Sequence, residues 1–375
     1  VTVAGSAGAQ HLAFEVKGGW RKSTGYAVAG GFDRDGDGTP DFAVGEPGDP
    51  VTGGSGRVDI YSGRDGAVIQ TIHGANKEHL GLGLGTVGDL NGDGVAELGV
   101  RSWQAFYVFN GRTGAQVFRV SRGTAALLGM SMGSAGDVNR DGTPDLYVGA
   151  PADIGPTRGK IYLLDGRSGQ SLREFTGPHS YSQFGYSVAN VGDWNRDGVV
   201  DFLVGAPTWA SYQFPAFVQI ISGRNGVALL TIPAPVVLDE RFGASVALLG
   251  QIDGDRTPDL AIGSPTSATT FAVAGKDGRV LWSRKHNDPR SNFGQAMVAV
   301  GDRDGDGVSE LWVGAPGRIS VSPGSMVLLK GQTGVPITRH VGGGGSYQFG
   351  FSLAAVGDLN RDGLVDVVAG APSEY

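Results

Sequence analysis

Asp33-Arg34-Asp35-Gly36-Asp37-Gly38-Thr39-Pro40-Asp41 is the stretch of sequence on which the prediction of the fold depends. Aspartate occupies its first, third, fifth and ninth positions, and glycine occupies the sixth. A hard cation such as Ca²⁺ takes about six to eight oxygen ligands, and alternate side chains of such a loop can surround it. Glycine suits the sixth position because the chain must turn sharply there, with a positive φ. The stretch therefore predicts a metal-binding loop, although Asp-Gly pairs also form ordinary hairpin turns.

The same pattern occurs seven times along the chain. The copies begin at intervals of about 48 to 58 residues, and six of them keep the acidic or asparagine side chains of the pattern. A period of this length is typical of a propeller or a repeat array. The predicted metal ligands of the six intact copies are Asp33, Asp35, Asp37, Asp41, Asp89, Asn91, Asp93, Glu97, Asp137, Asn139, Asp141, Asp145, Asp193, Asn195, Asp197, Asp201, Asp302, Asp304, Asp306, Glu310, Asp358, Asn360, Asp362 and Asp366.

Each copy lies in a unit of four short predicted strands. In one unit, residues 184–191 alternate as a first strand, and the loop 193–201 then turns the chain. Three further strands are predicted at 202–204, 218–221 and 228–232. Four short strands with regular turns are typical of a propeller blade, and no helical periodicity of useful length appears. The sequence predicts an all-β, seven-bladed β-propeller that occupies residues 1–375 as a single domain.

The two ends of the chain are predicted to share one blade. The last copy ends at Gly370-Ala371-Pro372, so it supplies only two strands. Residues 1–17 contain two further strand-like segments separated by a turn. We expect residues 1–17 to complete the blade that 349–375 begins, because closure of the ring removes free strand edges.

Three features of the repeated units together resemble a known family. Phe-Gly stands at the first strand of four units, the Asp-rich loop follows, and a Gly-Ala-Pro-like stop ends the second strand in six of the seven units. This combination resembles the FG-GAP repeat of integrin α-subunit N-terminal propellers and of many bacterial surface proteins, and it covers the whole chain. The resemblance implies a seven-bladed propeller with Ca²⁺ held between the first and second strands of a blade. Integrin α subunits fill only some blades in this way, so six intact loops are more similar to the bacterial members.

The amino-acid composition excludes several kinds of site and partner. The chain has no cysteine, which excludes disulfides, thiolate metal sites and a cysteine nucleophile. Its formal net charge is −7, and most of its acidic residues lie in the seven loops, so six bound Ca²⁺ ions would make the net charge positive. No apolar run reaches the ~18 residues of a membrane helix, and no basic block indicates nucleic-acid binding. We expect a monomer that neither inserts into a membrane nor binds nucleic acid.

Calcium is the metal that the intact loops favour, with about six ions per chain. Magnesium prefers fewer carboxylates and keeps several waters, and an EF-hand would need a twelfth-position glutamate and flanking helices. Metal-free turns are the alternative, but carboxylates held close together repel one another unless a cation neutralises them. Near-identical copies indicate a structural ion, because a catalytic site is usually unique in a chain. The six histidines show no repeated spacing. A Ser-His-Asp triad could still assemble in space, but we expect that the chain is not an enzyme.

The fifth copy, residues 251–259, departs from the pattern. Gln251 replaces the first aspartate, and Arg256 stands where the intact copies have glycine. Asp253, Asp255 and Asp259 remain and need a counter-charge. We expect Arg256 or a neighbouring base to supply it and the loop to hold no metal; a weak site with Arg256 turned to solvent is the alternative.

Aromatic and basic residues gather in the connections that leave a propeller on the face opposite the Asp-rich loops. This set comprises Trp20, Arg21, Lys22, Trp103, His179, Tyr181, Trp209, Tyr212, Phe214, Arg290 and Tyr347. Loops carry function more often than cores, and Trp, Tyr and Arg are common binding anchors. We expect a secreted or cell-surface binding or adhesion module that recognises a protein through this face. A glycan-binding propeller is the alternative, and part of a polysaccharide- or lipid-processing enzyme is a third possibility.

Overall fold

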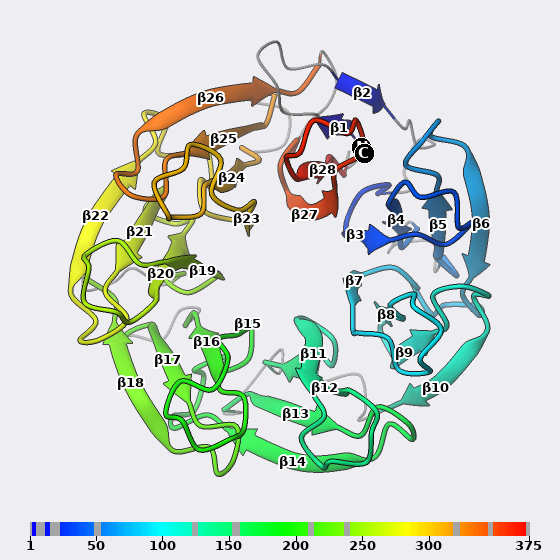
Figure 1. Ribbon diagram of the computed structural model, residues 1–375, viewed down its shortest axis with the longest axis horizontal. Coiled ribbons are helices and arrows are strands. Elements are labelled where there is room, and N and C mark those ends of the chain that lie inside the picture. Colours follow the sequence, from blue (N-terminus) through cyan, green and yellow to red (C-terminus); the bar gives the residue numbers. More distant parts are fainter. Residues whose placement is uncertain are drawn as a thin grey trace.

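The computed structural model describes residues 2–4, 12–15, 23–48, 54–121, 127–151, 158–208, 214–235, 241–317, 323–343 and 348–372. Within these residues the strands form seven four-stranded sheets. The sheets stand as blades around a central opening (Figure 1). The prediction of an all-β, seven-bladed propeller is confirmed. The described part of the chain contains no helix with the length and hydropathy to cross a membrane.

Neighbouring strands within each blade are antiparallel, and the first strand of each blade lines the central opening in Figure 1. Blades 1 to 3 comprise β3 (Val28–Phe32), β4 (Asp41–Glu46), β5 (Arg57–Tyr61) and β6 (Val68–His73); β7 (Gly83–Thr86), β8 (Leu98–Arg101), β9 (Phe106–Phe109) and β10 (Gln116–Val120); β11 (Met132–Gly136), β12 (Asp145–Ala150), β13 (Lys160–Leu164) and β14 (Ser171–Thr176). Blades 4 to 6 comprise β15 (Ser187–Asn190), β16 (Phe202–Ala206), β17 (Phe217–Ile221) and β18 (Ala228–Pro233); β19 (Ser245–Gly250), β20 (Asp259–Ser264), β21 (Thr269–Val273) and β22 (Val280–Lys285); β23 (Met297–Ala299), β24 (Leu311–Ala315), β25 (Ser325–Leu329) and β26 (Pro336–Val341). Blade 7 comprises β27 (Ser352–Gly357), β28 (Asp366–Gly370), β1 (Thr2–Ala4) and β2 (Leu12–Glu15).

Blade 7 joins the two ends of the chain. β1 pairs antiparallel with β28, with Val3 opposite Val368, and β2 pairs with the other edge of β1. The expected closure, two strands from each end, is therefore confirmed. The blade begun by the C-terminal copy of the repeat has no unpaired edge at β28.

The hydrophobic core lies between the blades rather than at one centre. The second and third strands of blades 1 to 6 are almost entirely buried, as in β16 and β24. One cluster of buried residues joins Tyr147 and Ile161 of blade 3 to Phe202 and Phe217 of blade 4. Each blade is therefore stabilised mainly by apolar contact with its two neighbours.

One close contact between blades explains why glycine begins the Gly-Ala-Pro stop. A Cβ added at Gly205 would lie 2.0 Å from the carbonyl oxygen of Gly243, the glycine that follows Phe242 in the next blade. The same clash recurs between Gly149 and Gly185 and, across the closure, between Gly370 and Gly25. The Phe-Gly and Gly-Ala-Pro elements of successive units are therefore two halves of one inter-blade contact that leaves no room for a side chain.

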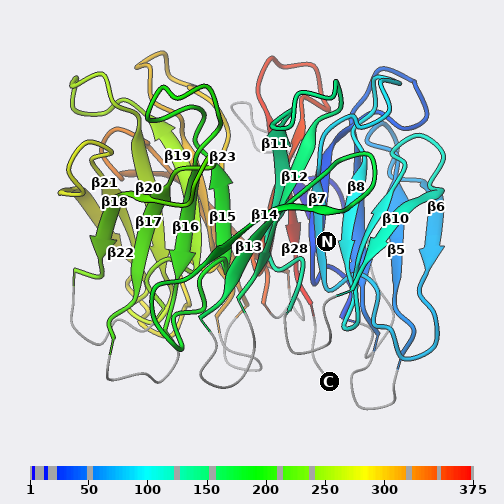
Figure 2. The same cartoon turned by 90° about the horizontal axis from the view of Figure 1, so that it is seen from below.

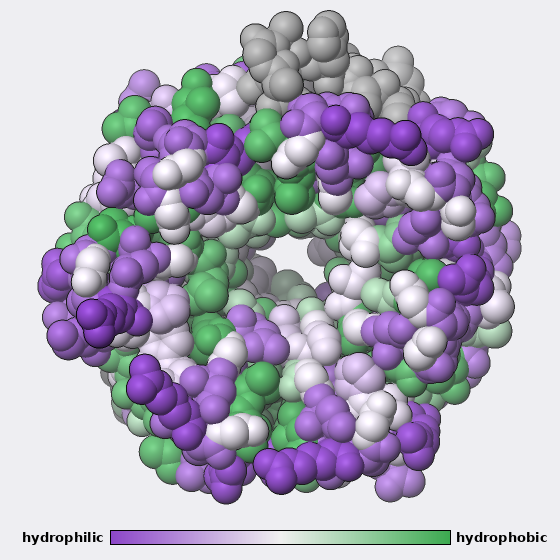
Figure 3. All heavy atoms as spheres, in the orientation of Figure 1, coloured by the Kyte–Doolittle hydropathy of each residue, from purple (hydrophilic) through white to green (hydrophobic). Residues whose placement is uncertain are grey.

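The connections emerge at opposite ends of the strands (Figure 2). The Asp-rich loops, which join first and second strands, share one end with the hairpins that join third and fourth strands. Seen from the direction of Figure 3, hydrophilic residues gather in clusters around the ring and leave the central opening free. The second residue of a loop packs on the hairpin of the next blade: a Cβ added at Gly275 of blade 5 would lie 2.7 Å from the ring of Trp194 in blade 4.

Candidate metal-binding loops and ligand face

The Asp-rich loops share one backbone conformation. Their fourth and sixth residues have positive φ, for example 76° at Gly36 and 82° at Gly38. A Cβ added at Gly38 would meet no atom within 4 Å, so the backbone conformation and not the available space favours glycine here. The fourth residue tolerates arginine in this region, with φ of 63° at Arg140 and 62° at Arg196.

The first aspartate of each intact loop accepts hydrogen bonds from amides of the loop. In blade 1 the N–H groups of Gly36 and Gly38 donate to the two carboxylate oxygens of Asp33, each at 2.9 Å. In blade 6 Asp302 accepts equivalent bonds from Gly305 at 2.7 Å and Gly307 at 2.8 Å. Matching bonds from loop amides reach the first aspartate of the other intact loops, namely Asp89, Asp137, Asp193 and Asp358. These bonds fix the position of the first carboxylate within each intact loop.

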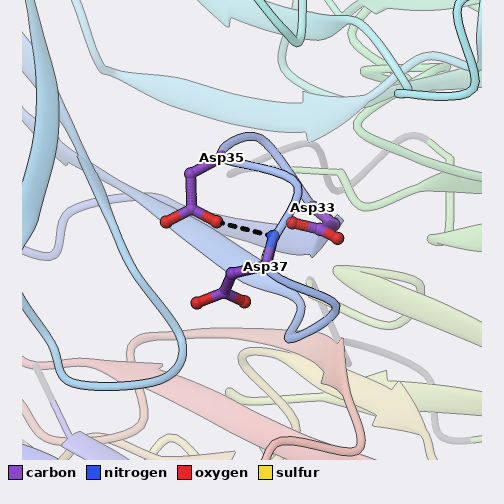
Figure 4. Close-up of side chains that lie close together, drawn as sticks. All are labelled: Asp33, Asp35 and Asp37. Atoms are coloured by element: carbon purple, nitrogen blue, oxygen red, sulfur yellow. Dashed lines mark hydrogen bonds between the residues drawn. The ribbon is translucent and has the colours of Figure 1, made fainter.

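The third and fifth side chains complete a cluster of oxygens. In blade 1 Asp35 Oδ1 accepts from the N–H of Asp37 at 3.1 Å (Figure 4). Asp33, Asp35 and Asp37 offer oxygens that lie within 4.8 Å of one another, and Asp302, Asp304 and Asp306 do the same in blade 6. In the other intact loops the third residue is asparagine, so Asn139 Oδ1 accepts from the N–H of Asp141 at 2.8 Å. These clusters of hard oxygen donors fit the ligand preferences of Ca²⁺.

The ninth carboxylate is buried and ties the loop to the hairpin beside it. Asp41 is fully buried; its Oδ2 accepts from the N–H of Arg34 at 2.7 Å and its Oδ1 from the N–H of Gly63 at 3.0 Å. Asp201 makes the equivalent bonds with Trp194 and Gly223. This link was not foreseen, although the glycine that recurs as the second residue of each hairpin is a signal for it.

Burial of the ninth carboxylate leaves a negative charge that a cation could stabilise. It raises the pKa of Asp41 and of Asp366 to about 6, in each case mainly by desolvation. Asp366 Oδ1 is buried and has no hydrogen-bond partner among the described residues. These observations, together with the oxygen clusters, show that the residues present fit a divalent cation.

Basic residues of the neighbouring hairpins also reach the loops. Arg64 lies 3.2 Å from Asp37 Oδ2, Arg224 lies 3.4 Å from Asp197 Oδ1, and Lys330 lies 2.6 Å from Asp304 Oδ2. The side chains of these bases are exposed, with 45% to 67% of their area accessible. Such exposed ion pairs are weak, so these bases can yield the carboxylate oxygens to a metal ion. Reasoning from the sequence missed them, because nothing in the order of residues places the hairpin over the loop.

The fifth loop keeps the turns but not the first-position carboxylate. The N–H groups of Asp255 and Thr257 donate to Asp253 and Asp255 at 3.1 and 2.8 Å, as in the intact loops. Arg256 adopts the positive φ of the replaced glycine, 73°. Asp253 Oδ2 accepts from Arg279 Nη2 at 2.5 Å. The neighbouring base that pairs with this loop is thus Arg279 of the hairpin.

On the opposite face, three of the expected anchors, Trp103, His179 and Phe214, have aromatic partners. Trp103, with 47% of its area exposed, packs against the buried ring of His79 at a centroid distance of 4.1 Å. His79 Nδ1 in turn donates to the carbonyl of Pro47 at 3.0 Å. His179 stacks on Phe214 at 4.4 Å with an interplanar angle of 5°. His79 was missed as a candidate, and its place directly before the Leu80-Gly81 pair gave little signal.

Of the remaining expected anchors, two lie within the described residues and six lie outside them. Tyr181 is 46% exposed and has a φ of 63°, and Arg290 is exposed. The expected contributions of Trp20, Arg21, Lys22, Trp209, Tyr212 and Tyr347 fall outside the described residues.

Comparison with known proteins agrees with the repeat pattern. An FG-GAP-like repeat model matches residues 137–204, and an FG-GAP repeat model matches residues 349–375. Integrin alpha-5 of Xenopus laevis is 33% identical over 197 residues, which cover 46% of this chain and 18% of the relative. Integrin alpha-V of Gallus gallus is 29% identical over 239 residues, which cover 56% of this chain and 22% of the relative. The chain therefore spans about a fifth of the length of these relatives.

A solved structure shares the fold across nearly the whole chain. It is described as the crystal structure of BBS1N in complex with ARL6DN, soaked with lead, and it superposes with a TM-score of 0.58. The match covers 95% of this chain and 93% of that chain at 12% sequence identity, so it supports the propeller fold alone. The repeat matches, the identity to integrins and the seven blades lead to one conclusion: the chain is an FG-GAP repeat protein, distantly related to the integrin α subunits.

Proposed function

We propose that this chain is a calcium-stabilised propeller that recognises a protein partner through the face opposite the Asp-rich loops. The relationship to integrin α subunits supports a binding or adhesion role, and the same resemblance favours a secreted or cell-surface location. We also propose that residues 1–375 fold as one domain and act as a monomer.

Calcium would be held by the six intact loops. Their first, third, fifth and ninth side chains, the residues given above as predicted ligands, would supply the oxygens. The ion would supply positive charge to carboxylates that the chain itself already holds in place through backbone N–H groups. Because the loops are preformed, the ion stabilises the folded blade without a large rearrangement.

The observation that carries the binding role is the setting of Trp103. An exposed tryptophan presents a large apolar surface to solvent, and here its support is a buried histidine anchored to the backbone. A rigid, exposed aromatic side chain loses little conformational entropy on binding, which is why tryptophan and tyrosine are common interface anchors. Tyr181 offers a second exposed ring on the same face.

A test of this proposal compares exposed apolar side chains on the two faces of the ring. The fluorescently labelled chain is applied, in calcium buffer, to an array of extracellular-matrix proteins and to a glycan array. We expect saturable binding to one or more proteins, at least tenfold weaker after Trp103→Ala with Tyr181→Ala. Val227→Ala, which alters a residue that is 59% exposed on the loop side, should leave binding unchanged.

Binding confined to glycans would favour the alternative, a lectin-like propeller, because aromatic rings also stack on sugar faces. Binding that survives the double substitution would contradict the proposed face.

A further inference from the structure

A cavity of about 160 Å³ lies between blades 5 and 6, away from Trp103 and Tyr181. Phe293, Val327 and Leu329, all buried, contribute its apolar lining. Other lining residues come from the end of β22 and from β26, the outer strands of the two blades, which follow one another along the rim in Figure 1. At ~30 Å³ per water molecule the space is several times larger than one water needs.

The polar lining of this cavity is almost entirely basic. Arg284, Lys285 and Arg339 contribute three permanent positive charges, and His286 contributes an imidazole. None of the described residues that line the cavity is acidic. Arg284 and Lys285 are exposed and Arg339 donates through Nη2 to Ser325 Oγ at 3.2 Å, which holds its guanidinium beside the cavity. Most of the cationic N–H groups here are therefore available to an incoming acceptor.

His286 lies among the positive charges of this site. Its Nδ1 lies 3.1 Å from the backbone nitrogen and 3.3 Å from the carbonyl oxygen of Asp288, and these contacts hold the ring beside the cavity. Burial lowers the pKa of His286, and the positive charges of Arg339 and Arg284 lower it further against the opposing effect of Asp288. The positive charges that surround His286 therefore disfavour its own cationic form.

We propose that this cavity binds an oxyanion, namely a carboxylate, sulfate or phosphate group, with the body of the bound molecule lying on Phe293 and Val327. Guanidinium groups bind such anions through two parallel N–H···O bonds, which fixes orientation as well as charge. An ammonium group adds a point charge, and the apolar floor would contact the uncharged part of an organic anion. The site lies on the same side of the ring as the proposed protein-binding face, but between blades 5 and 6, and Trp103 and Tyr181 do not line it, so one proposal can fail while the other holds.

Two lysines of blade 5 provide a matched test. Lys285 lines the cavity at one end of the blade, whereas Lys276 is exposed in the hairpin at the other end. The full chain is titrated with sodium sulfate by isothermal calorimetry, at constant ionic strength against sodium chloride. We expect one saturable sulfate site in the wild type and in Lys276→Gln. Lys285→Gln and Arg339→Gln should each weaken it roughly tenfold, the usual worth of a hydrogen bond to a charged group.

Separate titrations with acetate and with phosphate identify which oxyanion the cavity prefers. Absence of saturable binding of all three anions to the wild type would overturn the proposal. So would an equal loss of affinity in Lys276→Gln and Lys285→Gln, because that result indicates attraction by overall charge. Since Arg339 also bonds to Ser325, Arg339→Gln could impair folding, and Lys285→Gln, which loses no hydrogen bond in this structure, then decides the question.

Discussion

The loop of blade 4 and the loop of blade 5 have the same length and lie on neighbouring copies of one scaffold, yet they handle their carboxylates differently. In blade 4 the carboxylate of Asp193 accepts N–H bonds from Asp197 and Gly198, both at 2.8 Å. In blade 5 Gln251 replaces that aspartate, and Asp253 pairs with Arg279 at 2.5 Å. The third- and fifth-position turns survive in both loops.

The difference teaches that the backbone of the loop does not depend on the first aspartate. Arg256 accepts a φ of 73° even though a side chain there is strained. The ninth carboxylate, Asp259, is fully buried and bonded to its hairpin glycine, Gly275, as in the intact loops. The strands and local turns shape the loop, and what separates blade 5 from the intact loops is the loss of the first carboxylate and the close pairing of Asp253 with Arg279.

Removal of calcium should produce the largest effect, because it leaves the clustered carboxylates of all six intact loops without the cations that would neutralise them. Chelation is expected to lower the melting temperature by many degrees, since each site contributes about 1–2 kcal/mol when free calcium is ~10–30 times its Kd. Scanning calorimetry with calcium, with magnesium and with chelator measures this. Equal and small effects of the two metals would break the comparison, because the intact loops would then not be selective calcium sites.

A pair of substitutions sharpens the comparison at single loops. Asp193→Ala should release one ion and reduce the calcium-dependent gain in stability by about 1–2 kcal/mol. Asp253→Ala should leave the calcium-dependent gain unchanged, because its carboxylate already pairs with Arg279. Urea unfolding with and without calcium gives both values. A similar loss of calcium dependence in the two variants would show that the fifth loop binds metal like the others.

The third test uses pH in the chelated protein. Burial raises the pKa of Asp366 to about 6, above the value near 4 of an unfolded chain, so the folded state binds the extra proton between these values. Stability without calcium should therefore fall as pH rises from about 4 to about 6, by on the order of 1–2 kcal/mol for this residue. Asp366→Asn should flatten that part of the profile, as measured by thermal unfolding in chelator. An unchanged profile in the variant would mean that Asp366 is not the group responsible.

The smallest effect is expected at Arg256. Arg256→Gly removes the strain of a side chain at positive φ but adds the chain entropy of glycine, so the net gain should be under about 1 kcal/mol. Chemical denaturation in chelator measures this gain. Gly198→Arg in blade 4 is the converse change and should destabilise its loop by a similar amount. A clear loss of stability in Arg256→Gly would show that the arginine makes a stabilising contact that outweighs the strain.

Much of this architecture could be predicted because the repeat displays it seven times. The strand order, the closure through Val3 and Val368 and the positive φ of Gly38 all follow from the repeated pattern and turn chemistry. The contact between Gly205 and Gly243 could not be predicted. These residues lie in different blades, and the repeat pattern does not show how closely neighbouring blades pack.

The same limit applies to the site. The bond from Gly63 to Asp41 and the pairing of Arg279 with Asp253 depend on how a hairpin lies over a loop some twenty residues away. The support of Trp103 by His79 likewise brings together two connections of neighbouring blades. Side-chain partners of this kind depend on packing, whereas the repeat fixes only the order of the elements.

Anomalous scattering from crystals grown in calcium tests the central claim most directly, because it places and counts the ions at once. We expect six peaks, one in each intact loop, within about 2.3–2.6 Å of the ligand oxygens. We expect no peak beside Asp253 and Asp259, where Arg279 supplies the charge. A seventh peak in that loop, or empty intact loops, would contradict the account.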